Sequence, residues 1–135
     1  MKYFIYFFTS ILIIGCSGDD DVVTNPDLNS SGLGGEWNLI NVSGGFIGIN
    51  ENLDKGIIIW NFNETNKNVV ITNNNMNDAI NDILPSGTYN FSMVTINGNE
   101  ELIINDRNLG NFELTNNEFT IDEQFRDGFR YTFQR

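Results

Sequence analysis

The sequence predicts an all-β protein: an up-and-down antiparallel eight-stranded barrel that follows a signal peptide and a flexible tether. Short stretches of alternating apolar and polar residues recur throughout residues 35–135, which is the pattern of strands with one buried face. Glycine, asparagine and aspartate residues separate these stretches and favour tight turns between them. A meander of eight such strands can close on itself, which leaves no strand edge exposed. An open two-sheet sandwich is the alternative architecture.

Residues 1–15 have the organisation of a signal peptide. Lys2 is followed by twelve mostly apolar residues and then by Gly15, next to the single cysteine of the chain, Cys16. The apolar run is shorter than the roughly 20 residues that span a bilayer. The letters IIGC at residues 13–16 resemble the lipobox of bacterial lipoproteins, with isoleucine where leucine is usual. This resemblance implies cleavage before Cys16 and lipidation of Cys16, palmitate being one such acyl group; an ordinary secretory signal is the alternative.

Residues 16–34 have the composition of a flexible acidic tether, because they combine Asp, Asn, Ser and Gly with few large apolar side chains. Asp19, Asp20 and Asp21 follow the cysteine closely and resemble the acidic export signal of surface lipoproteins of Bacteroidota. Ser17 stands where the usual signal for inner-membrane retention has an aspartate. The resemblance implies a protein that is lipid-anchored in the outer membrane and exposed at the cell surface. A solvated acidic spacer is the alternative.

The barrel strands are placed by alternation and by turn residues. Asn97-Gly98 is the strongest hairpin signal, since both residues of a tight type I′ turn need positive φ, and Asp127-Gly128 predicts a second hairpin turn. Residues 46–49 are expected to continue the first strand past a glycine kink. Eight strands are expected, at residues 37–43, 56–63, 68–72, 87–95, 101–105, 109–114, 118–122 and 129–134.

Residues 73–86 are the least regular part of the predicted barrel. Apolar residues recur there at spacings of three and four, which is typical of a helix, and Pro85 would end a helix at the residue before it. One or two helical turns are therefore expected, with a mobile loop as the alternative. The apolar residues concerned are Met76, Ala79, Ile80, Ile83 and Leu84.

Gly35-Glu36-Trp37 resembles the Gly-x-Trp signature at the start of the first strand of lipocalins. With the later runs KGIIIWNF, SGTYNF and YTFQR, it makes residues 34–135 similar to the small lipocalin-like domains of bacterial surface lipoproteins. The resemblance implies the lipocalin-like barrel fold. The long helix that follows a typical lipocalin barrel has no counterpart before Arg135.

In lipocalins an arginine near the end of the barrel lies across the first-strand tryptophan. Arg130 and Arg135 both qualify, but only Arg135 shares a face with the apolar residues of the last strand. We therefore expect Trp37 and Arg135 to form a structural pair at the barrel base through a cation–π contact. A terminal arginine in solvent is the alternative.

Composition and charge exclude several functions. The chain has 18 acidic and 7 basic residues, a net charge of −11, which argues against nucleic-acid binding. It has no histidine, so it lacks the commonest general base and cannot form a Ser-His-Asp triad. Its single cysteine rules out an intramolecular disulfide and a paired-cysteine zinc site. We expect no enzymatic activity, no cofactor and no bound metal; Asp122, Glu123 and Asp127 are interpreted as a solvated turn rather than a cation site.

Two functions remain. The favoured one is binding of a small apolar molecule inside the barrel, neutral or cationic because no Lys or Arg faces inward except Arg135. The alternative is a non-enzymatic interaction or structural module of the cell surface, with a barrel filled by side chains and with residues 44–55 and 73–86 contacting a surface protein. With either function, the protein would be anchored to the membrane by its N-terminal lipid. The residues expected to line a ligand site are Ile58, Trp60, Phe62, Tyr89, Phe91, Met93 and Tyr131.

Overall fold

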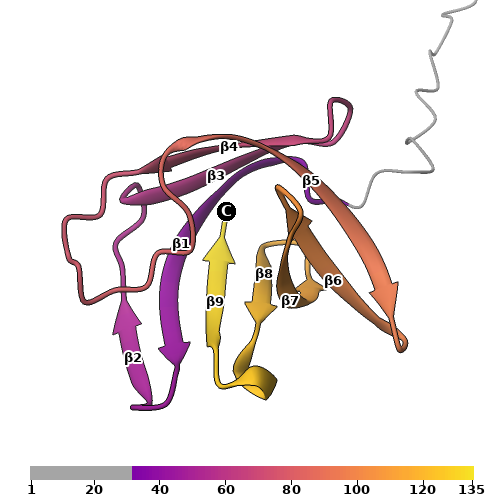
Figure 1. Ribbon diagram of the computed structural model, residues 1–135. Helices are drawn as coiled ribbons and strands as arrows, with labels where there is room; N and C mark the ends of the chain where they lie inside the picture. The colour runs from indigo at the N-terminus through magenta and orange to yellow at the C-terminus, as the bar shows by residue number, and fades with distance from the viewer. Residues whose placement is uncertain (1–31) are drawn as a thin grey trace, which may run out of the picture.

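A computed structural model describes residues 32–135, which form a barrel of β-strands (Figure 1). The predicted signal peptide, Cys16 and Asp19 to Asp21 lie outside the described residues. In chain order the elements are β1 (Gly35–Gly44), β2 (Ile49–Asn52), β3 (Ile58–Asn63), β4 (Asn68–Asn73), β5 (Gly87–Ile96), β6 (Asn99–Ile104), β7 (Arg107–Leu114), β8 (Glu118–Asp122), the 3-10 helix η1 (Gln124–Arg126) and β9 (Phe129–Gln134).

Eight of these strands close into a barrel in which neighbours are antiparallel. β1 pairs with β3 on one side and with β9 on the other, and β3 to β9 follow one another in sequence order. β2 is a short addition beside the second half of β1. The predicted eight-stranded up-and-down barrel is therefore confirmed, and the open sandwich is not the fold.

The two longest strands turn the corners of the barrel. The first half of β1, residues 35–38, pairs with β3, whereas the part from Asn38 onward pairs with β9. β5 likewise pairs with β4 through residues 87–90 and with β6 through residues 91–96. Each of these ten-residue strands therefore pairs with different neighbours along its two halves. This change of partner lets a sheet of short strands close into a barrel.

The core follows from the period of two along each strand. In β3, Ile58, Trp60 and Phe62 are buried, while the asparagines at 61 and 63 are exposed. The same alternation in the other strands sends one apolar face inward. The buried apolar side chains are Leu33, Trp37, Leu39, Val42, Leu53, Ile58, Trp60, Phe62, Val69, Ile71, Phe91, Leu102, Ile104, Leu109, Phe112, Phe119, Ile121, Tyr131 and Phe133.

The folded part reaches further toward the N-terminus than the expected boundary at residue 35. Leu33 is fully buried, and its backbone N–H donates to the Glu64 carboxylate at 3.0 Å. Its carbonyl accepts a hydrogen bond of 2.7 Å from Nε1 of Trp37. Leu33 therefore belongs to the barrel and not to the tether.

One of the two predicted hairpin turns is present, and the other is replaced. Asn97 and Gly98 have φ of 51° and 85° and join β5 to β6 directly, as a type I′ turn requires. Between β8 and β9, the expected two-residue turn at Asp127-Gly128 is wrong. η1 occupies this connection, and Asp127 ends it in the left-handed conformation with φ of 59°.

The prediction that residues 46–49 continue the first strand is also wrong. Residues 45–48 form a turn that reverses the chain into β2. Gly45, with φ of 70°, lies so close to β9 that a Cβ atom there would stand 2.7 Å from the Phe129 ring. The glycines therefore permit a reversal of the chain against β9, and not the kink within one continuous strand that was expected.

Residues 73–86 contain no helix, which corrects the helical expectation. Asparagines at alternate positions bind the backbone two residues ahead: Asn73 accepts from the N–H of Asn75, Asn75 from that of Asn77, and Asn77 from that of Ala79, at 2.9–3.0 Å. Such side-chain bonds compete with helical backbone bonds. Residues 74–86, called the strap below, instead pack Ile80, Ile83 and Leu84 against the core.

Candidate functional site

The barrel has two dissimilar ends. The base holds the start of β1, the end of β9 and the turns at residues 64–67, 97–98 and 115–117. The opposite end, called the rim below, holds three longer connections and one short turn. These are residues 45–57 with β2, the strap, the turn at 105–106, and residues 123–128 with η1.

The base is closed by the two residues that the sequence pairs. The guanidinium carbon of Arg135 lies 4.2 Å from the centroid of the Trp37 ring. Arg135 also donates to the carbonyls of Gly32 and Gly34, so it ties the last strand to the chain just before the first. The Trp37 ring is fully buried beneath it.

The interior above the base holds aromatic rings from several strands, some of which are not neighbours. Phe62 of β3 meets Phe119 of β8 at 5.9 Å between centroids, and Trp60 of β3 meets Phe133 of β9 at 4.8 Å. Phe119 also stacks on Phe133 at 4.4 Å and 12° and packs edge-on against Trp37 at 5.0 Å. Because β3 and β8 are separated in the ring by β1 and β9, the contact between Phe62 and Phe119 crosses the barrel, and these rings occupy the interior above Trp37.

The residues expected to line a ligand site belong to this core or pack against it, and Phe62 contacts both Trp60 and Phe91, at 6.0 and 5.1 Å between ring centroids. Five of them are buried, and Tyr89 and Met93 are half-buried against the core. The Tyr89 hydroxyl, expected as a polar group for a ligand, donates to the Pro85 carbonyl of the strap at 3.0 Å. Burial, and then the nearby Glu123 carboxylate, raises the pKa of Tyr131 above its usual value.

Trp60 carries a buried polar group that has no hydrogen-bond partner within residues 32–135. Its side chain is fully buried, and no acceptor among residues 32–135 lies within hydrogen-bonding distance of its Nε1–H. The indole of Trp37, by contrast, donates to a backbone carbonyl. A buried donor without a partner costs about 1–3 kcal/mol, so the interior keeps one unused polar group.

The larger of the two pockets that we describe lies at the rim, between the β2–β3 loop and the strap. Its volume is about 280 Å³. Beside it, a hydrogen bond of 2.9 Å from the N–H of Asn74 to the carbonyl of Ile57 joins the strap to the β2–β3 loop. The pocket thus joins the two regions, 44–55 and 73–86, that were expected to carry contacts. Its lining residues are Asn52, Leu53, Asp54, Ile57, Asn75, Asn77 and Ile80.

A second pocket, of about 190 Å³, lies where β5 passes from β4 to β6. It is bordered by the polar residues Asn90, Ser92, Asn105 and Asp106 beside Phe91 and Ile103. Of the residues predicted to line a ligand site, Phe91 is therefore the one that borders a pocket described here, and that pocket is not the barrel interior.

The strap is held across the rim by polar bonds. The Asn73 amide donates to the Asp82 carboxylate at 2.8 Å and to the Leu84 carbonyl at 3.2 Å. From β7, the Arg107 guanidinium donates to the Ile83 carbonyl at 3.5 Å. Ile83 has a φ of 56°, an unfavourable conformation for a β-branched residue. The bonds on either side hold it there.

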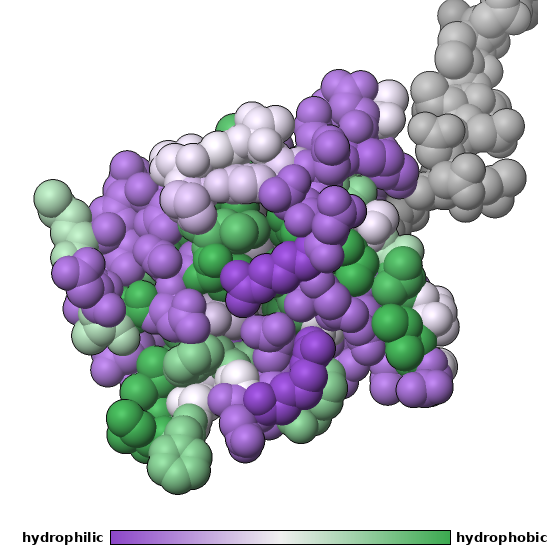
Figure 2. All heavy atoms as spheres, viewed as in Figure 1, coloured by the Kyte–Doolittle hydropathy of each residue, from purple (hydrophilic) through white to green (hydrophobic). Residues whose placement is uncertain are grey.

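The rim also exposes large apolar side chains. Phe46 and Ile47, in the turn between β1 and β2, are 98% and 91% exposed, and Met76 of the strap is 96% exposed. Phe125 of η1 is 59% exposed, and the Arg126 guanidinium lies 4.7 Å above its ring. A hydrogen bond of 2.9 Å from the Gly45 N–H to the Gly128 carbonyl holds the first turn beside the η1 connection. Figure 2 shows apolar atoms projecting at the lower left of the molecule.

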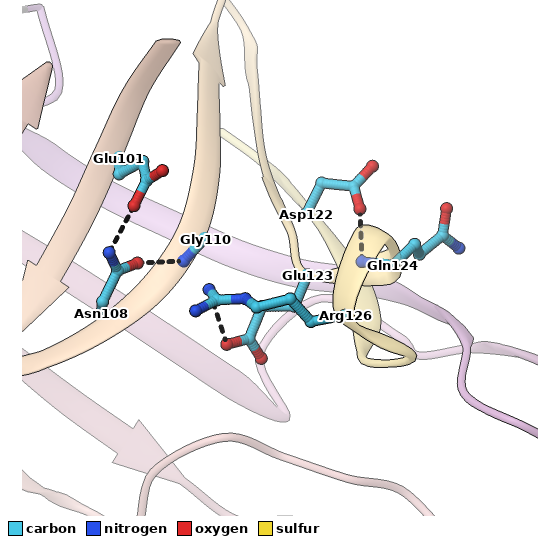
Figure 3. A network of polar contacts seen from close by, with 7 residues as sticks. All are labelled: Glu101, Asn108, Gly110, Asp122, Glu123, Gln124 and Arg126. Atoms are coloured by element: carbon cyan, nitrogen blue, oxygen red, sulfur yellow. Dashed lines mark hydrogen bonds and ion pairs between the residues drawn. The ribbon is translucent and has the colours of Figure 1, made fainter. Parts of the chain in front are cut away.

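Two of the three acidic residues near η1, Asp122 and Glu123, are paired within the protein (Figure 3). Glu123 forms an ion pair with Arg126 at 3.6 Å, and Asp122 pairs with Arg130 at 3.5 Å while accepting from the Gln124 N–H. Within residues 32–135, no three Asp, Glu, His or Cys side chains gather as metal ligands would. The candidate cation site therefore has no support in the described geometry.

Sequence reasoning missed Glu101, which is only 8% exposed on β6. Its carboxylate accepts a hydrogen bond from the side-chain amide of Asn108, and Oδ1 of Asn108 in turn accepts from the Gly110 N–H at 2.8 Å (Figure 3). The three residues hold β6 against β7 where their register shifts. A glutamate before the apolar run Leu102 to Ile104 was the one available signal, and it did not distinguish burial from exposure.

Comparisons with protein-family models, with curated proteins and with solved structures found no match for this chain. Within residues 32–135 we find no apolar helix of membrane-spanning length.

Proposed function

We propose that the protein is a lipid-anchored lipoprotein of the cell surface, in which a filled barrel acts as a scaffold and the rim contacts a partner. The lipobox resemblance of residues 13–16 and the aspartates at 19–21 support the anchor and the surface location. The contact between Phe62 and Phe119 across the barrel carries the scaffold role. Eight-stranded barrels are either filled by side chains or hold one small ligand, and these rings take the central space.

The rim is the part of this scaffold suited to contacts. It combines the pocket of about 280 Å³ with exposed apolar side chains from neighbouring connections. Binding residues are commonly carried on loops that a rigid framework positions. The net charge of −11 favours a partner surface that is neutral or basic.

A titration with a neutral apolar dye such as Nile red, followed by dye and tryptophan emission, tests the filled barrel. We expect no saturable change in the emission of Trp60, because the rings around it leave no space. A saturable response that Trp60→Phe abolishes would contradict the scaffold role.

The second candidate function is binding of a small apolar molecule within the barrel, favoured by the unpartnered Nε1–H of Trp60. A neutral ligand with one hydrogen-bond acceptor would satisfy that donor. Access would require displacement of the strap, whose Ile80, Ile83 and Leu84 pack against the core. Matched fatty acids should bind more weakly than neutral probes, since a buried carboxylate would find no inward-facing basic partner. Stronger binding of the fatty acids would contradict this candidate.

The anchor is tested separately by metabolic labelling with radioactive palmitate. We expect Cys16→Ala to abolish labelling, while the neighbouring Ser17→Ala variant keeps it. Protease added to intact cells should digest the barrel. A Cys16→Ala protein that is still labelled would refute lipidation at this residue, and a barrel digested only after lysis would refute surface display.

A further inference from the structure

Apart from Phe125, which is 59% exposed, the exposed large apolar side chains of residues 32–135 divide into two groups. Phe46, Ile47 and Met76 are more than nine-tenths exposed, and all three belong to the rim. Val70, Val94 and Ile96, on β4 and β5, are between 36% and 46% exposed. Partial exposure of single apolar residues is ordinary, but nearly complete exposure of three large ones at one end of a barrel is the feature expected of a docking surface.

We propose that these rim side chains insert into the surface of a neutral lipid bilayer. The three project from two connections, the β1–β2 turn and the strap, with Phe125 beside the first. These three side chains are 91–98% exposed, so almost no other part of the protein covers them. They therefore project separately and do not form one flat apolar face. A fluid bilayer accommodates such points without shape complementarity, as it does the Phe and Leu side chains of interfacial helices.

Charge selects the kind of lipid. The chain carries −11, and Glu51 of β2 and Asp127 beside η1 add acidic groups close to the rim. Anionic head groups would repel this surface, whereas zwitterionic ones would not. Arg126 lies over the Phe125 ring and is half exposed, so its guanidinium can reach a head-group phosphate while the ring goes deeper.

The position of the rim relative to the proposed anchor is compatible with contact. This step rests on lipidation of Cys16. The rim lies one strand length from Gly32, and a ten-residue strand is about 33 Å long. The fifteen residues between Cys16 and Gly32 can extend to about 50 Å at most, so the barrel can tip its rim toward the bilayer that holds its anchor.

The experiment uses residues 17–135, which retain every buried side chain from Leu33 to Phe133 and lack the acylated cysteine. Binding is measured by co-sedimentation with vesicles of pure phosphatidylcholine and, in parallel, of phosphatidylglycerol. We expect binding to phosphatidylcholine and at least tenfold weaker binding to phosphatidylglycerol. The triple variant Phe46→Ser, Ile47→Ser, Met76→Ser should lose at least tenfold in partitioning. The control variant Val94→Ser, Ile96→Ser, altered near the base, should bind like the parent chain.

Several results would overturn the proposal. One is a parent chain that does not bind phosphatidylcholine; another is a triple variant that binds as well as the parent. If light scattering finds a dimer that the triple variant converts to a monomer, the rim side chains contact a second copy and not lipid. Since no lipidated residue is present, failure here leaves the palmitate-labelling test of Cys16 unaffected.

Discussion

At the base of the barrel the largest apolar side chain, Trp37, is covered, whereas at the rim large apolar side chains are almost fully exposed. Trp37 is fully buried, donates its N–H to the Leu33 carbonyl and lies beneath the Arg135 guanidinium. Phe46 and Ile47, one strand length away at the other end of β1, are covered by almost nothing. The same residue types therefore serve two purposes: at the base they supply the free energy of folding, and at the rim they remain available to something outside the chain.

The largest test of this contrast is truncation of one aromatic residue at each end. Trp37→Ala should lower the free energy of unfolding by about 3–5 kcal/mol, because it empties a buried, ring-packed site. Phe46→Ala should change it by no more than about 0.5 kcal/mol, as for other surface substitutions. Urea unfolding followed by circular dichroism measures both. Comparable losses at the two positions would mean that the rim side chains contribute to folding.

The base and the barrel wall could be predicted from sequence because both follow from periodicity. Alternation placed Ile58, Trp60 and Phe62 on one inward face, and the same period of two assigned Arg135 to the face of Phe133. Asn97-Gly98 fixed one turn, since few other dipeptides accept two positive φ values. Such inferences need only local geometry and the closure of the sheet.

The rim could not be predicted in the same way. Residues 73–86 have helical spacing of apolar side chains, but asparagine side chains at 73, 75 and 77 take up the backbone N–H groups that a helix would need. The rim pocket depends on the strap meeting the β2–β3 loop, and the sequence does not show which connections lie side by side. The filled interior depends on ring contacts between strands that are not neighbours, so alternation alone could not decide between a cavity and a core.

A smaller effect tests how the rim turn is held against the barrel. Gly45→Ala introduces a Cβ that would stand 2.7 Å from the Phe129 ring, at a φ of 70°. Gly48→Ala has a similar φ, 72°, but its Cβ would meet nothing within 4 Å. Backbone strain alone should cost about 1–2 kcal/mol in either variant. Thermal unfolding should show the larger loss for Gly45→Ala, because only that variant also disturbs β9; equal losses would mean that the Phe129 ring moves aside freely.

The smallest effect concerns the guanidinium that covers the base. Arg135 is exposed to solvent, and its cation–π contact with Trp37 is expected to contribute about 0.5–1 kcal/mol. A double-mutant cycle isolates this contribution, with Arg135→Met retaining the aliphatic length and Trp37→Leu removing the aromatic face. The Arg135 bonds to the Gly32 and Gly34 carbonyls are lost in both Arg135 variants of the cycle, so they cancel from the coupling energy. We expect a favourable coupling of at least about 0.5 kcal/mol in urea unfolding, little reduced by salt because the ring bears no net charge. Strict additivity would show that the base is held by the buried ring and the backbone bonds, with the charge contributing nothing.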